Sequence, residues 1–143
     1  MKTPVDFGVD DSALTEATVS NDLRSARQPE RRILAELARW GYDHDTVFGI
    51  KLALEEAITN AVRHGNARDT SKRLVVRYYV DAARVVIMVR DQGNGFCPDD
   101  VPDPTADENL DRPNGRGIML MQSYMTKVRF NDSGNEVWML KER

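Results

Sequence analysis

The chain has 143 residues and a mass of 16.2 kDa, which suits one domain and is too short for two of ordinary size. Hydrophobic residues make up 41% and charged residues 30%, a composition typical of folded rather than disordered proteins. The formal net charge is −3 and the pI about 5.4, so the composition predicts no basic surface for nucleic acid or an anionic membrane.

Rare residues and apolar runs narrow the class further. Cys97 is the single cysteine, so an internal disulfide is excluded, and with two histidines a zinc site of four Cys and His ligands cannot form. The longest apolar run is Val85–Val89, whereas a membrane-spanning helix needs about 20 residues. Asp6, Asp10 and Asp11 stand where a signal peptide carries basic and then apolar residues. We therefore expect a soluble, cytoplasmic protein.

The N-terminal part of the chain predicts a lead-in and then a strand. Residues 1–13 are polar and acidic without periodicity, and we expect a flexible lead-in to a single domain over residues 14–143. Leu14–Val19 is short and rich in threonine and apolar residues, which favours a strand.

Two helices are predicted next. Pro29 and Glu30 favour the start of the first, which Gly41 ends. The second begins near Asp43–Asp45, whose carboxylates can cap free N–H groups, and Gly65 terminates it. Its apolar stripe has helical spacing and consists of Val47, Ile50, Leu54, Ala57, Ile58 and Ala61.

The middle of the chain predicts a hairpin followed by a long loop. Arg73–Val80 and Arg84–Arg90 are strand-like runs separated by three residues, and the uninterrupted apolar run within the second predicts a central strand. The loop at about residues 96–114 is rich in prolines and acids, and a segment of this length is typical of a functional lid or a disordered insert.

A helix and a second hairpin complete the expected order. The helix covers Gly117–Tyr124, and the hairpin pairs Lys127–Phe130 with Glu136–Leu140. Helices and strands are segregated along the chain, which favours the α+β class. We expect a two-layer sandwich in which a mixed, mostly antiparallel sheet carries about three helices on one face.

The second predicted helix carries the first candidate site. Glu56 and Asn60 are four residues apart, so their side chains share one helix face. A carboxylate can take a proton from a hydroxyl group, and an amide oxygen can bind Mg²⁺. Taken alone, such a pair is more often a solvated surface pair, and the neighbouring Glu55 and Thr59 form another of the same spacing.

The sequence DQGNG directly after the apolar strand is the second candidate. Asp91 is placed to accept a hydrogen bond from an amino group, and Gly93 and Gly95 allow the backbone to approach a flat ligand closely. An ordinary Asp/Gly turn leaving a strand is the alternative.

The third candidate is the glycine pair Gly115 and Gly117 at the predicted helix start. Exposed N–H groups and the helix dipole favour phosphate there. The guanidinium groups of Arg112 and Arg116 match phosphate oxygens, although surface arginines are usually just solvated. A glycine pair also serves simply to allow a tight turn.

The order of these motifs is more specific than any one of them. EAITNAVRHG (residues 56–65) resembles the N box of the GHKL ATPase superfamily, whose Bergerat fold is shared with histidine kinases, gyrase and heat-shock chaperones. DQGNG is similar to its G1 box and GRGI (residues 115–118) to its G2 box. The short length and the E-A-x-T-N-A-x-x-H-G pattern most resemble the anti-sigma-factor serine-protein kinases, over residues 14–141.

This resemblance implies a role for each matching residue. Glu56 would be the catalytic general base, Asn60 would coordinate Mg²⁺, and Asp91 would bind the adenine amino group of ATP in a pocket shaped by Gly93 and Gly95. The phosphate-contacting residues would be Arg112, Gly115, Arg116 and Gly117.

The chain also departs from the family pattern. Many relatives carry a GTT sequence near the adenine, whereas Gly134 is followed here by Asn135 and Glu136, so that hydroxyl contact is not expected. The many prolines and acids of the lid are a second departure.

The resemblance implies two related functions. One is a kinase that phosphorylates a small partner similar to anti-anti-sigma proteins and controls transcription by partner switching. The other is an ATP-gated regulator that sequesters a sigma factor or another signalling protein without kinase turnover. Arg31, Arg32 and Trp40 are a candidate surface for it, although such residues more often form a solvated basic face. A homodimer is a further expectation. A small domain with coincidental motifs is the third alternative.

Overall fold

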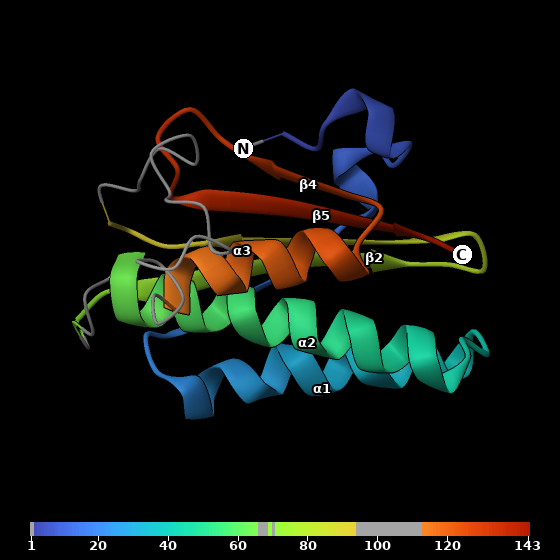
Figure 1. Cartoon of the computed structure of the whole chain (residues 1–143), viewed down its shortest axis with the longest axis horizontal. Helices are drawn as coiled ribbons and strands as arrows, with labels where there is room; N and C mark the ends of the chain where they lie inside the picture. Colours follow the sequence, from blue (N-terminus) through green and yellow to red (C-terminus); the bar gives the residue numbers. More distant parts are fainter. Residues whose placement is uncertain (1, 66–68, 70, 94–112) are drawn as a thin grey trace.

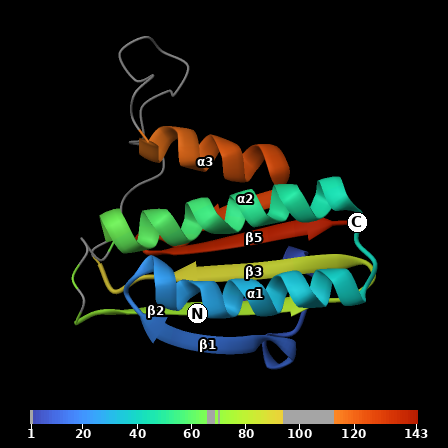
Figure 2. The same ribbon diagram turned by 90° about the horizontal axis from the view of Figure 1, so that it is seen from below.

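In the described part of the chain, five strands form one sheet and three helices lie on one of its faces (Figures 1 and 2). The computed structural model of the chain describes residues 2–65, 69, 71–93 and 113–143. The strands are β1 (Thr15–Ser20), β2 (Arg73–Val80), β3 (Arg84–Arg90), β4 (Lys127–Phe130) and β5 (Glu136–Glu142). The helices are α1 (Leu23–Arg39), α2 (His44–Asn60) and α3 (Pro113–Tyr124). This arrangement confirms the predicted α+β sandwich.

The strand order is β1-β2-β3-β5-β4, so β3 lies at the centre of the sheet as its apolar run predicts. All four strand pairings among the described residues are antiparallel, whereas a mixed, mostly antiparallel sheet was expected. Val89 of β3 lies opposite Val76 of β2 and Val137 of β5. Alternate residues of β3 belong to the apolar clusters on the two opposite faces of the sheet, which explains why each position from 85 to 89 is apolar.

Helix α1 begins at Leu23, six residues before the predicted start at Pro29. Asp22 caps the helix by accepting hydrogen bonds from the backbone N–H of Ser25 at 2.6 Å and from its hydroxyl at 2.9 Å. Pro29 is buried inside the helix, although a proline there costs one backbone hydrogen bond. The prediction was wrong because it took the proline as the first helical residue and overlooked the cap. Gly41 ends the helix with a φ of +71°, as predicted.

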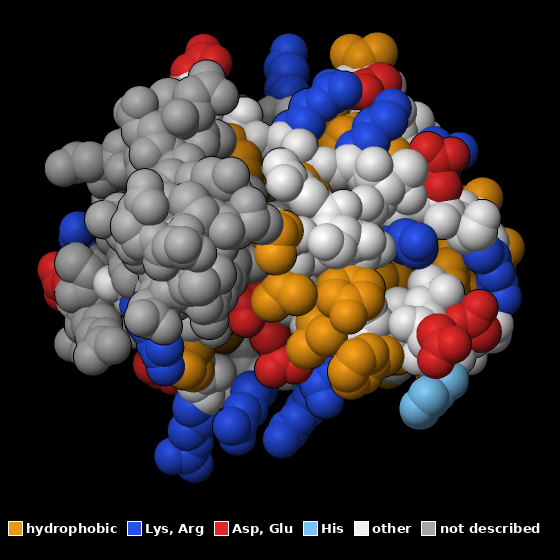
Figure 3. Space-filling view, in the orientation of Figure 1, with side chains coloured by type: hydrophobic (Ala, Val, Ile, Leu, Met, Phe, Trp, Pro, Cys, Tyr) orange, Lys and Arg blue, Asp and Glu red, His pale blue; other side chains and the backbone are white. Residues whose placement is uncertain are grey.

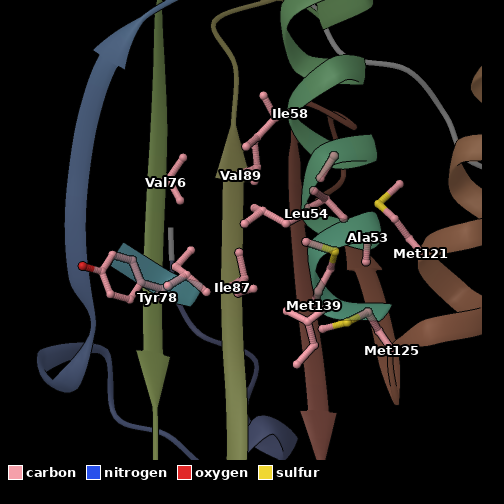
Figure 4. Close-up of a cluster of buried hydrophobic side chains, with 14 of the residues drawn as sticks. Ala53, Leu54, Ile58, Val76, Tyr78, Ile87, Val89, Met121, Met125 and Met139 are labelled. Atoms are coloured by element: carbon pink, nitrogen blue, oxygen red, sulfur yellow. The ribbon is translucent and has the colours of Figure 1, made fainter. Parts of the chain in front are cut away.

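The core lies between the sheet and α2 (Figure 4). Leu54 of α2 lies against the sheet side chains Ile87 and Met139, and Met121 of α3 and Met125, the residue after that helix, add to the core from the other side. The apolar stripe predicted for α2 is this contact surface. Burial of each large side chain of this kind contributes about 1.5–3 kcal/mol to folding.

Helices α2 and α3 approach each other closely at Gly49. A Cβ atom at this position would lie 2.8 Å from the ring of Tyr124, so the glycine makes room for α3. Helix α3 also begins earlier than predicted, at Pro113, and residues 115–117 therefore belong to the helix itself.

The opposite face of the sheet is covered by the N-terminal segment, which the sequence analysis treats as a lead-in. This segment forms two short 3₁₀ turns, Val5–Phe7 and Asp11–Ala13. Phe7 is fully buried in a second apolar cluster, and Arg84 donates a hydrogen bond of 2.8 Å to its carbonyl oxygen. Asp6 pairs with Lys127 and Arg129 on β4. The sheet residues of the cluster are Val86, Met88, Trp138 and Leu140.

Phe7→Ala is expected to lower the free energy of unfolding by about 3–5 kcal/mol, because the change removes a fully buried ring and leaves a cavity. Urea denaturation monitored by tryptophan fluorescence would measure the decrease in the free energy of unfolding. Val5→Ala is the matched control, since Val5 is 98% exposed in the same 3₁₀ turn. Equal stabilities of the two variants would contradict the packing described for the outer face.

Candidate functional site

Three segments far apart in the sequence meet at one end of the molecule. The C-terminal end of α2, the end of β3 and the start of α3 lie together in both ribbon views (Figures 1 and 2). Helix α2 packs against both β3 and α3, so the three segments belong to one packed unit. The three candidate motifs of the sequence lie at these three segment ends: Glu56 and Asn60 on α2, Asp91 after β3, and Gly115 and Gly117 on α3.

Glu56 and Asn60 occupy the last two turns of α2. Both side chains are half-buried, beside the buried residues Ala57 and Ile58 that face the core. This position at the edge of the apolar stripe is the one predicted from their spacing. The helix continues as a π-helical turn over Ala61–Gly65, a distortion found frequently at functional sites.

Asp91 follows directly after β3 and is 7% exposed. Its Oδ1 atom accepts a hydrogen bond of 2.8 Å from the backbone N–H of Gly93, which closes a tight turn. Burial raises the pKa of the Asp91 carboxyl above its ordinary value, against smaller lowering effects of the Gly93 N–H, Lys72 and Arg90. A buried carboxylate with a raised pKa is typical of a functional position.

Two amide side chains that the sequence analysis did not assign to the site hold this turn. The Oε1 atom of Gln92 accepts a hydrogen bond of 2.7 Å from the backbone N–H of Arg73. The Nδ2 atom of Asn135 donates one of 3.4 Å to the carbonyl oxygen of Gly93. In the sequence, Asn135 is distinguished only because it stands where many relatives of the family carry a threonine. Its contact with Gly93 joins residues 42 positions apart, so local sequence carries no signal of it.

The remaining predicted residues divide into two groups. Gly95, Arg112 and the greater part of the predicted lid lie outside the described residues. Gly115, Arg116 and Gly117 lie in the first turns of α3, which begins at Pro113. The N–H of Gly115 belongs to the first turn, where N–H groups have no partner within a helix, whereas the N–H of Gly117 faces the carbonyl of Pro113. The start of α3 therefore offers N–H donors and the positive end of a helix dipole.

A separate groove lies along α1. Five arginines and two glutamates occur in this helix, and the groove encloses about 550 Å³. Basic side chains project from the edge of the molecule at which α1 lies (Figure 3). Trp40, at the end of the helix, is 41% exposed. The residues lining the groove are Arg24, Arg27, Gln28, Arg31 and Arg32.

An antiparallel sheet with helices on one face, an Asp-x-Gly turn after its central strand and a Glu-x-x-x-Asn pair on the adjacent helix define a GHKL-type ATPase domain. The family model for the histidine kinase-like ATPase domain matches residues 19–141. The chain therefore belongs to the histidine kinase-like ATPase domain family. No helix among the described residues is long and apolar enough to cross a membrane.

Two relatives support this assignment, and a solved structure supports the fold. The chain is 34% identical over 135 residues to the serine-protein kinase RsbW of Bacillus licheniformis, covering 84% of this chain and 83% of the relative. It is 33% identical over 133 residues to the serine-protein kinase RsbW of Bacillus subtilis, with the same coverage. A crystal structure of the RsbU and RsbW domains of a Mycobacterium tuberculosis protein has a TM-score of 0.60 and 20% identity. It covers 91% of this chain and 32% of that longer chain.

Asp91→Asn is expected to raise the free energy of unfolding of the nucleotide-free protein at pH 7 by about 1 kcal/mol, because a buried charge becomes a neutral amide. The amide oxygen can still accept the Gly93 N–H. Because the pKa of Asp91 is raised in the folded protein, the difference in stability between the variant and the wild type depends on pH. As the pH falls through the raised pKa toward the ordinary value of 3.8, the wild-type carboxyl also becomes neutral, and this difference in stability shrinks.

Urea denaturation at a series of pH values would measure this difference. A variant that is less stable than the wild type at pH 7 would show that the charged carboxylate stabilises the turn, contrary to expectation.

Proposed function

We propose that this chain is an ATP-dependent serine-protein kinase and anti-sigma factor. It phosphorylates a small partner similar to anti-anti-sigma proteins and so controls transcription by partner switching. The observation that carries the proposal is that the C-terminal end of α2, which carries Glu56 and Asn60, lies beside the end of β3, which Asp91 follows, in a histidine kinase-like ATPase domain. The names of the two Bacillus relatives support the kinase activity.

Asp91 selects the base in this proposal. Its buried carboxylate accepts a hydrogen bond from the 6-amino group of adenine, while Oδ1 keeps its bond to the Gly93 N–H. Gly93 and Gly95 leave room for the flat base beside the backbone. An amino group that pairs with a buried carboxylate contributes more than an ordinary hydrogen bond, because the acceptor is charged and shielded from water.

The phosphates of ATP lie between α2 and the start of α3. Asn60 would hold a Mg²⁺ ion through its amide oxygen, and the ion would supply charge neutralisation at the phosphates. Among the described residues, no group of three or more His, Cys, Asp or Glu side chains could bind a metal. The proposed Mg²⁺ site does not require such a group, because Asn60 is its one ligand from the protein. The contacts to the phosphates come from Gly115, Gly117, Arg112 and Arg116.

Glu56 is the catalytic residue of the transfer. Its carboxylate accepts the proton of a serine hydroxyl on the partner while the serine oxygen forms a bond to the terminal phosphorus of ATP. The bond from that phosphorus to the β-phosphate oxygen breaks, and ADP leaves. The half-buried position at the edge of α2 keeps Glu56 both fixed by the helix and accessible to an incoming hydroxyl.

The groove on α1 is our candidate for partner recognition. Its lining includes Arg31 and Arg32, so the groove is basic although the chain as a whole has a net charge of −3. A basic groove of this kind suits the docking of an acidic partner. The same groove favours the second candidate function, an ATP-gated regulator that sequesters a sigma factor or another signalling protein without kinase turnover. A homodimer is compatible with both functions.

Glu56→Gln is expected to lower the phosphorylation rate of the partner by about 10²–10⁴-fold, because the amide cannot accept the serine proton. Transfer of labelled phosphate from ATP to serine would measure the rate, and ATP titration would show binding unchanged within about twofold. Glu55→Gln, an exposed neighbour on the same helix, is the matched control.

Undiminished phosphorylation by Glu56→Gln would contradict the catalytic role. Absence of phosphorylation by the wild type, with ATP-dependent capture of a sigma factor, would favour the regulator without turnover.

Binding of ATP is expected to be about 1–3 kcal/mol more favourable than binding of GTP, because guanine presents an acceptor at the position where Asp91 needs a donor. Calorimetric titration of both nucleotides with Mg²⁺ would measure the difference. Asp91→Asn should reduce this preference, since its amide can donate to guanine. Equal affinities of the wild type for ATP and GTP would count against the assignment of Asp91.

A further inference from the structure

We propose that Gln92 and Asn135 are positioning residues that clamp the turn from Asp91 to Gly93 between two neighbouring strands and so fix the direction in which Asp91 meets the base. The proposal rests on the ATP site proposed above. It adds to that site two residues whose side chains act on the turn rather than on the nucleotide.

The first clamp joins the turn to β2. Gln92 Oε1 accepts a hydrogen bond of 2.7 Å from the backbone N–H of Arg73, the first residue of that strand. The Arg73 guanidinium in turn donates a hydrogen bond of 2.9 Å from Nη1 to the hydroxyl of Ser20, the last residue of β1. The residue after Asp91 is thus tied to the ends of two strands.

The second clamp joins the turn to the connection between β4 and β5. Asn135 Nδ2 donates to the Gly93 carbonyl oxygen at 3.4 Å, and the Asn135 carbonyl oxygen accepts from the backbone N–H of Asp91 at 2.9 Å. The Asn135 side chain is itself held, because its Oδ1 atom accepts a hydrogen bond of 2.7 Å from Nδ2 of Asn131. One asparagine therefore contacts the turn at both of its ends.

The strand order places the two clamps on opposite sides of Asp91. In the sheet, β3 lies between β2 and β5, so Gln92 anchors the turn toward one neighbour and Asn135 toward the other. A turn held from two sides cannot swing toward either neighbour without breaking a hydrogen bond. Since Asp91 Oδ1 is bonded to the Gly93 N–H, any shift of Gly93 also turns the carboxylate.

A fixed carboxylate matters because hydrogen bonds weaken steeply as their angle departs from linearity. A buried acceptor that is already aligned costs no reordering when the base arrives. Loss of either clamp should therefore weaken the contact to the 6-amino group and leave contacts to the phosphates unchanged. This difference separates positioning from a general effect on stability.

The test compares ATP with inosine triphosphate, which carries an oxygen in place of the 6-amino group. Gln92→Ala and Asn135→Ala are each expected to raise the Kd for Mg–ATP by about three- to tenfold, the effect of losing much of one hydrogen bond. The Kd for Mg–inosine triphosphate should stay within about twofold of the wild-type value. The preference for ATP should fall accordingly, with the melting temperature measured in parallel.

Two conservative variants and one control sharpen the result. Gln92→Glu keeps an acceptor for the Arg73 N–H and should retain the preference for ATP. Asn135→Asp keeps an acceptor for Asn131 but loses the donor to Gly93, so it should behave like Asn135→Ala. Ser133→Ala changes an exposed residue in the same connection between β4 and β5 and should alter neither affinity.

The possible failures are distinguishable. If wild-type protein does not prefer ATP over inosine triphosphate, the proposed role of Asp91 fails, and the clamp fails with it. If the wild type has the preference and both alanine variants keep it, only the clamp is overturned. Equal weakening of both nucleotides would also overturn the clamp. Because Gln92 is exposed, its variant tests the proposal even if Asn135→Ala fails to fold.

Discussion

The contact between α2 and the centre of the sheet is the constraint on which the rest of the structure depends. Ile50, Leu54 and Ile58 are fully or almost fully buried on one side of the helix. Because this stripe fixes the rotation of α2 about its axis, Glu56 and Asn60 lie at its edge. The end of α2 that carries them lies beside the end of β3, which Asp91 follows. The same apolar packing that folds the domain therefore sets the geometry of its proposed chemistry.

At Asp91 the proposed function runs against stability. A carboxylate that is 7% exposed has lost most of its hydration, and its raised pKa reflects that loss. The hydrogen bond from Gly93 offsets part of the cost, and the pairing proposed for the adenine amino group would offset more. The turn is held by the Gly93 N–H bond to the carboxylate and by hydrogen bonds of Gln92 and Asn135.

The two faces of the sheet are covered by different means. Helices bury the inner face, whereas the outer face is buried by a short N-terminal segment with Phe7 as its apolar anchor. Ion pairs of Asp6 with Lys127 and Arg129 place this segment, but partly exposed pairs of this kind contribute little. Burial of Phe7, which is fully enclosed, is therefore the main contribution of this segment to stability.

Periodicity and turn residues were sufficient to predict β2, β3 and the stripe of α2, because each depends on short-range pattern. They were also sufficient to place Glu56 and Asn60 on one helix face and Asp91 at a strand end. The start of α1 was missed, since a proline signal was given more weight than the cap at Asp22. What only the tertiary structure decided are contacts between distant segments: the burial of Phe7, and the hydrogen bonds from Gln92 to Arg73 and from Asn135 to Gly93. Such contacts depend on which strands become neighbours, and a pattern read along the chain does not contain that information.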